Sequence, residues 1–114
     1  MKLPETIKIG FQIWRIEIDD LSREDDRRGV TFKEKQLIKL DPTLPEESKK
    51  ITLWHEIKHA IAEFLGIDGD RKYDEEEWIT RMSGMEITVL DENKELREFL
   101  WGSGEEKNLE QNGG

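Results

Sequence analysis

The chain contains two histidines, His55 and His59, which stand four residues apart, and Glu56 directly follows the first of them. On an α-helix this spacing places both imidazoles on one side, about one turn apart, so both can reach one cation. Neutral imidazole is a good ligand for Zn²⁺. Glu56 can reach a metal-bound water as a general base without binding the metal itself. The H-E-x-x-H pattern therefore predicts a zinc centre that activates water.

A third protein ligand is needed, because a catalytic zinc ion normally has three and leaves one position for water. The chain has no cysteine and no further histidine. The remaining ligand must therefore be a carboxylate, which predicts a ligand set of two histidines and one glutamate or aspartate. The best source is the acidic run 74–77, which opens an expected second helix.

Three glutamates, Glu75, Glu76 and Glu77, compete for this third position. The helical row of Glu76 continues with one apolar and two small residues, so it can lie close against the first helix. Glu75 is the strongest competitor, because Trp78 and Met82 lie on its row, whereas Glu77 faces a more polar row. All three also suit an exposed first turn, where the helix dipole favours acidic side chains.

Two other interpretations of polar side chains remain open. The histidines also fit an ordinary helix with one ring packed and one exposed, although two polar rings are costly on so apolar a helix.

A peptidase also needs a group that stabilises the oxyanion. Tyr73 and Arg81 are weak candidates for it, and capping or packing is the first expectation for Tyr73.

The first half of the chain predicts short strands. Residues 6–18 alternate in two phases, which indicates a hairpin that turns near Gly10, with a bulge near Ile13 as the alternative. A charged loop should follow, and then two strands at 30–32 and 36–40. Strand 36–40 could be a sheet edge that accepts an extended peptide, or an edge that merely faces water.

The second half of the chain predicts helices. The motif helix should begin near Pro45 and end at Gly66, because Pro suits a first turn and Gly a C-terminal stop. A second helix, capped by Asp74, should run to about Leu90, and residues 94–101 form a short amphipathic segment. Three tryptophans are expected in the core, one of them at the rim of the cleft: Trp54, Trp78 and Trp101.

Composition narrows the class of protein. With 114 residues, the chain predicts a single domain over 1–101 and a disordered tail over 102–114. The net charge of −9 and the lack of a basic stripe argue against nucleic acid and anionic membranes as partners. No leader, membrane span or cysteine is found in the sequence. We therefore expect a cytoplasmic monomer.

H-E-x-x-H with a second, glutamate-bearing helix soon after it resembles the gluzincin metallopeptidases. More narrowly, it resembles the small phage and bacterial ImmA/IrrE-type metallopeptidase-like proteins. The resemblance extends over 6–101 and is specific around 52–60 and 75–83. It implies an α+β, zincin-like fold in which a small antiparallel sheet packs on the motif helix and the glutamate helix. It also implies His55, His59 and Glu76 as zinc ligands, Glu56 as general base and a peptide or protein as substrate.

The sequence thus leaves three functions to compare. The first is a zinc-dependent metallopeptidase. The second is a zinc-stabilised regulatory or binding module of the same fold without turnover, since a metal bound only by the folded state adds directly to stability. The third is a metal-free interaction protein. Glu56 distinguishes the first two, because only hydrolysis needs a general base.

Overall fold

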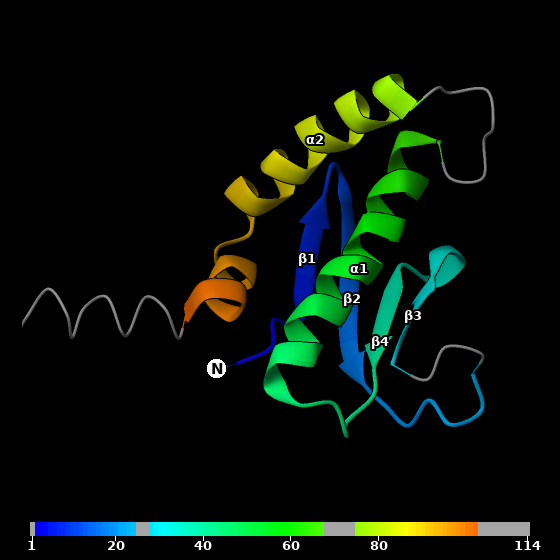
Figure 1. Ribbon diagram of the computed structural model, residues 1–114, viewed down its shortest axis with the longest axis vertical. Helices are drawn as coiled ribbons and strands as arrows, with labels where there is room; N and C mark the ends of the chain where they lie inside the picture. Colours follow the sequence, from blue (N-terminus) through cyan, green and yellow to red (C-terminus); the bar gives the residue numbers. More distant parts are fainter. Residues whose placement is uncertain (1, 25–27, 68–74, 103–114) are drawn as a thin grey trace, which may run out of the picture.

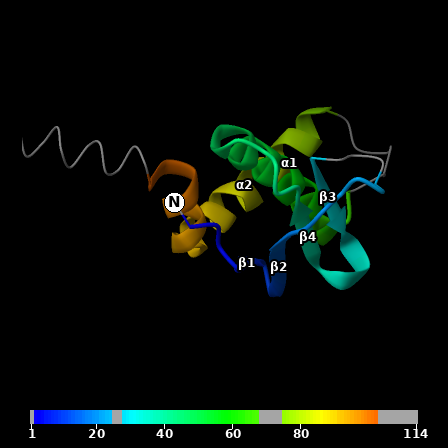
Figure 2. The ribbon, with the colours of Figure 1, turned by 90° about the horizontal axis from the view of Figure 1, so that it is seen from below.

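The computed structural model describes residues 2–24, 28–67 and 75–102. In this part of the chain four strands form one sheet, and the two long helices lie on one side of it (Figures 1 and 2). The strands are β1 (Thr6–Ile9), β2 (Gln12–Ile18), β3 (Gly29–Phe32) and β4 (Leu37–Leu40). The helices are the short 3₁₀ helix η1 (Lys33–Lys35), α1 (Glu46–Leu65), α2 (Glu75–Glu92) and the segment 94–102. The expected α+β class is confirmed.

The hairpin predicted at Gly10 joins β1 to β2. Gly10 has φ = +61°, which glycine adopts without strain, and a Cβ placed there would clash with the ring of Phe64. The turn explains the two phases of the sequence, because Ile7 and Ile9 on one strand face the helices together with Trp14 on the other. The alternative bulge near Ile13 is not needed.

The sheet is mixed, with the strand order β1-β2-β4-β3, so the expectation of an antiparallel sheet is wrong in one pairing. β2 runs parallel to β4, while the β1–β2 and β3–β4 pairs are antiparallel. The chain crosses from β2 to the far edge, forms β3 there and returns through η1 to place β4 in the middle. Because Leu37, Ile38 and Leu40 are all buried, β4 suits an interior position better than an edge.

Strand 36–40 is therefore not a sheet edge, and the prediction that a peptide adds to it is wrong. The two edges are β1 and β3. At β1 the Asn93 side chain occupies the edge: its Oδ1 accepts a hydrogen bond from Lys8 N (2.7 Å) and its Nδ2 donates to Lys8 O (2.8 Å). Within the described residues, β3 pairs with β4 alone. The β3 side is thus the edge that remains open to pairing.

α1 begins after Pro45 and ends at Gly66, whose φ of +73° is left-handed, as the sequence predicts. Its buried side packs on the sheet through Leu53, Ile57 and Ile61. These contacts fix the rotation of α1 about its axis, and with it the direction in which the histidine motif points.

The prediction for the tryptophans is largely wrong. Trp14, in β2, is the fully buried one, whereas Trp54 is half-buried and Trp78 and Trp101 are exposed. Asp74, the expected cap of α2, and the tail 103–114 lie outside the described residues. In the described ranges, no helix combines the length and apolar composition needed to cross a membrane.

Candidate metal centre

His55 and His59 are exposed on α1, and their Nε2 atoms lie 3.2 Å apart. The ring planes meet at 75°, and the two nitrogens are close enough for one ring to donate a hydrogen bond to the other. A tetrahedral zinc ion bound to two imidazoles at its usual distance separates the two nitrogens by about 3.3 Å. The side chains present therefore fit two positions of a zinc coordination sphere.

Glu56 lies on the side of α1 that faces β3, and only 3% of its surface is exposed. The Thr31 hydroxyl of β3 lies 2.6 Å from Glu56 Oε1 and 3.2 Å from Glu56 O. A buried carboxylate needs such a donor, because desolvation without a hydrogen bond is costly. The hydroxyl therefore fixes one carboxylate oxygen and leaves Oε2 for another partner.

Gly29 lets β3 approach α1 closely enough for this contact. A Cβ at Gly29 would lie 2.6 Å from Thr52 Cγ2 and 3.1 Å from Glu56 Cγ. Because side chains alternate along a strand, Gly29 and Thr31 face α1 together, one without a side chain and one with a hydroxyl. The sequence contains this alternation, but nothing in it indicates that Thr31 contacts Glu56.

Two clefts open on either side of the motif and share His55 and Glu56. The first, of about 230 Å³, is lined by Gly29, Val30, Thr31, Lys33, His55, Glu56 and His59. The second, of about 170 Å³, is lined by Arg28, Ile51, Thr52, His55 and Glu56. Arg28, which the sequence analysis missed, thus contributes a cation beside the motif. Residues of β3 and the histidine motif thus line one cleft.

The structure does not bring Glu76 to the histidines. Within 2–24, 28–67 and 75–102, no three His, Asp or Glu side chains are grouped so that they could hold a metal ion. Glu76 and Glu77 are exposed in the first turn of α2, and Glu77 lies 3.9 Å from Arg81. The Glu75 side chain and Tyr73 lie outside the described residues. Arg81 does not line either cleft.

The position of α2 explains this separation. α2 packs on the flank of α1 that carries Lys58, whose Nζ lies 3.6 Å from Glu86 Oε2. β3 packs on the opposite flank, through Thr52 and Glu56. The exposed histidine side lies between these two flanks, and no carboxylate of the described residues joins the two histidines there.

Comparison of the chain with protein-family models, with curated proteins and with solved structures gave no match. The resemblance to ImmA/IrrE-type proteins therefore rests on the residues of the motif and its neighbours.

Proposed function

We propose that this protein is a small zinc-dependent metallopeptidase in which His55 and His59 bind the metal and Glu56 is the general base. The observation that carries the proposal is the 3.2 Å distance between the two Nε2 atoms, beside a buried, hydrogen-bonded glutamate. When bound, zinc supplies Lewis-acid chemistry: it makes water a nucleophile near neutral pH and polarises the carbonyl of the scissile bond.

Glu56 takes the proton of the attacking water. Because Thr31 Oγ1 donates to Oε1, the proton goes to Oε2, and from there to the amine that leaves when the peptide bond breaks. Thr31 is a positioning residue in this scheme: it holds the carboxylate in one rotamer while the proton moves. Arg28 supplies positive charge in the adjoining cleft, where the carbonyl oxygen becomes negative.

The substrate is an extended polypeptide that pairs with β3. Peptides commonly bind by adding a strand to an open sheet edge, where main-chain hydrogen bonds supply affinity. Asn93 occupies the β1 edge, which leaves β3, and β3 residues line the 230 Å³ cleft with His55, Glu56 and His59. A peptide paired with β3 therefore brings its backbone carbonyls to the motif.

The third zinc ligand comes from the acidic run at the start of α2, with Glu76 first and Glu75 as the alternative. Both stand in the acidic run 74–77, the source of carboxylates that the sequence offers soon after the motif. Zinc content per chain for the wild type, Glu75→Ala, Glu76→Ala and Glu77→Ala identifies the ligand. We expect one zinc per chain in the wild type and in Glu77→Ala, and weak binding in one of the other two variants.

Glu56→Gln is the decisive variant for catalysis. It keeps a hydrogen-bond acceptor for Thr31 but cannot take a proton, so zinc content should hold while hydrolysis of an unstructured protein such as casein falls by about 10²-fold or more. His55→Ala should lose both zinc and hydrolysis.

The alternative is a zinc-stabilised module without turnover. It would be established if the zinc-loaded wild type cuts no polypeptide and chelation with EDTA only lowers its melting temperature. If neither zinc nor Co²⁺ binds the purified protein, both functions fail together.

A further inference from the structure

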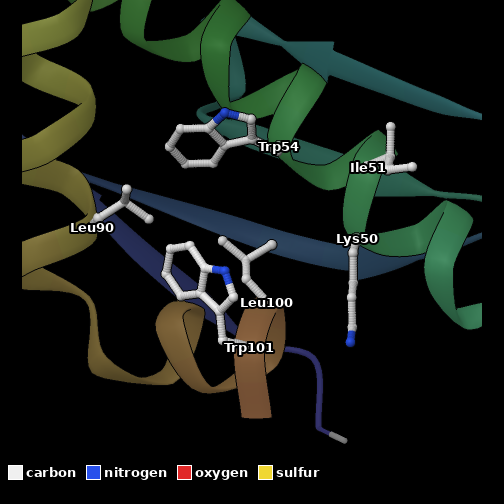
Figure 3. Close-up of a pocket in the computed structure, with 6 residues that line it drawn as sticks. All are labelled: Lys50, Ile51, Trp54, Leu90, Leu100 and Trp101. Atoms are coloured by element: carbon white, nitrogen blue, oxygen red, sulfur yellow. The ribbon is translucent and has the colours of Figure 1, made fainter. Parts of the chain in front are cut away.

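An apolar groove of about 380 Å³ lies on the side of α1 away from β3 (Figure 3). It lies between α1, the end of α2 and the segment 94–102, and it is lined by Lys50, Ile51, Trp54, Leu90, Leu100 and Trp101. The two indole rings lie above and below it, with Leu90 and Leu100 between them. Ile51 is 72% exposed and Trp101 is 55% exposed, so much apolar surface faces solvent here. Exposed apolar side chains that line one groove are a common feature of binding sites.

The groove adjoins the candidate metal centre through one residue. Ile51 lines the groove and also the 170 Å³ cleft that contains His55 and Glu56. Ile51 precedes His55 by one turn of α1, a rise of about 6 Å along the helix. An extended peptide covers that distance with about two residues. A molecule bound at the metal centre can therefore continue into the groove.

The groove also has a charge preference. Lys50 is the one charged residue among the six that line it, and Lys50 makes no ion pair with any described residue. The chain as a whole carries a net charge of −9. A cation beside an apolar groove in an otherwise acidic protein favours an occupant that combines an apolar side chain with a carboxylate.

We infer that this groove is a substrate-recognition subsite for a bulky apolar side chain of the polypeptide, with an acidic residue beside it that pairs with Lys50. The subsite receives a residue at least about two positions from the scissile bond. The inference rests on the proposed peptidase function, whose substrate class it specifies. A second copy of this chain is a weaker occupant, because two molecules of charge −9 repel each other.

Binding is tested with the zinc-loaded Glu56→Gln variant, which does not cut the probe. The probe is a fluorescein-labelled peptide, Gly-Ser-Leu-Phe-Glu-Gly-Ser. Its binding is measured by fluorescence anisotropy. Two control peptides replace Leu-Phe by Ala-Ala, or Glu by Lys. We expect both controls to bind about tenfold more weakly, because each loses one recognition element.

Matched variants locate the binding site, each added to Glu56→Gln. Ile51→Asp should weaken binding about tenfold, whereas Ile87→Asp should not, although Ile87 is also an exposed helical isoleucine (69%). Lys50→Glu should reverse the preference, so that the Lys peptide binds better than the Glu peptide. Lys94→Glu, a change of the same charge outside the groove, should leave the preference as it was.

The outcomes separate this inference from the function on which it rests. Equal effects of Ile51→Asp and Ile87→Asp, or no binding of the probe, would overturn the subsite. If Ile51→Asp instead converts a dimer into a monomer in sedimentation, a second copy occupies the groove and the inference is wrong. If the probe binds as expected but the wild type cuts no peptide, the subsite holds as a peptide-binding groove and the peptidase proposal fails.

Discussion

The Thr31 hydroxyl in β3 lies 2.6 Å from the Glu56 carboxylate in α1, across 25 residues of sequence. This contact joins the open edge of the sheet to the glutamate of the histidine motif. The same hydroxyl lies 3.2 Å from Glu56 O, so it can turn to the backbone when the carboxylate engages another partner. The Thr31 side chain thus holds Glu56, and β3, which carries Thr31, forms a wall of the cleft.

Thr31→Val tests this contact, because valine keeps the shape of threonine and removes the hydroxyl. Glu56 is then a buried carboxylate without its donor, which should lower the free energy of unfolding by about 1–3 kcal/mol. Urea denaturation in the presence of EDTA measures the loss without a contribution from metal. Thr31→Ser should restore most of the stability. If Thr31→Val costs as much in a Glu56→Leu background as in the wild type, the two residues are not coupled.

Gly29→Ala tests the close approach of β3 to α1. The added Cβ would lie 2.6 Å from Thr52 Cγ2, so β3 must move away from α1, at a cost of about 1–3 kcal/mol. Thr52→Ser removes that methyl group and should recover part of the loss in the double variant. Thermal unfolding of the four proteins in this cycle measures the coupling. Strict additivity of the two changes would contradict the packing described.

Asn93→Ala tests whether the Asn93 side chain protects the β1 edge. The change removes the two hydrogen bonds to Lys8 and the one from Asn93 Nδ2 to Val89 O (2.7 Å). Since Lys8 is exposed, water replaces these bonds in part, and we expect a loss of about 1–2 kcal/mol. Hydrogen exchange at the Lys8 amide should become faster. Asn93→Asp keeps the acceptor for that amide and should preserve more of its protection than Asn93→Ala.

Acid should destabilise the fold partly through Asp41, which precedes α1. Hydrogen bonds from the Thr43 hydroxyl and Thr43 N hold the pKa of Asp41 below its ordinary value of 3.8. A lowered pKa in the folded state stabilises the protein above the unfolded pKa, and this contribution disappears as pH falls through the folded value. Asp41→Asn should therefore reduce the slope of stability against pH below about pH 4.

Asp19 provides a second test in the same pH window. The hydrogen bond from Lys39 Nζ (2.7 Å) lowers the pKa of Asp19, so Asp19→Asn should reduce the acid slope as well. The same contact raises the pKa of Lys39, whose contribution is present below its ordinary value of 10.5 and disappears as pH rises through the folded value. Denaturant unfolding across the pH range measures both the loss of stability in acid and the loss at high pH. Unchanged slopes in Asp41→Asn and Asp19→Asn would contradict these assignments.

Several elements could be predicted because their causes are local. The four-residue spacing of His55 and His59 places both rings on one side of a helix. The bounds of that helix follow from Pro45 and Gly66. The turn at Gly10 follows from the change of phase in the alternating residues on either side of it. Each of these features depends on neighbours within a few positions along the chain.

Other features could not be predicted, because they depend on which segments meet in space. The position of strand 36–40 in the sheet depends on the return through η1, which places β4 between β2 and β3 and leaves β3 as the open edge. Trp101 has a large apolar side chain of the kind expected in a core. In the folded chain it instead lines the groove beside the segment 94–102 and is 55% exposed.

The sequence by itself determined the histidine pair, the glutamate beside it and the helix that carries them. The reason is that residues four positions apart on a helix lie on the same side of it. Only the tertiary structure decided that Thr31 holds Glu56, that Gly29 makes room for this contact and that β3 rather than β4 is an edge of the sheet. These are relations between segments distant in the chain, and they arise from packing of α1 on the sheet rather than from local conformational preference.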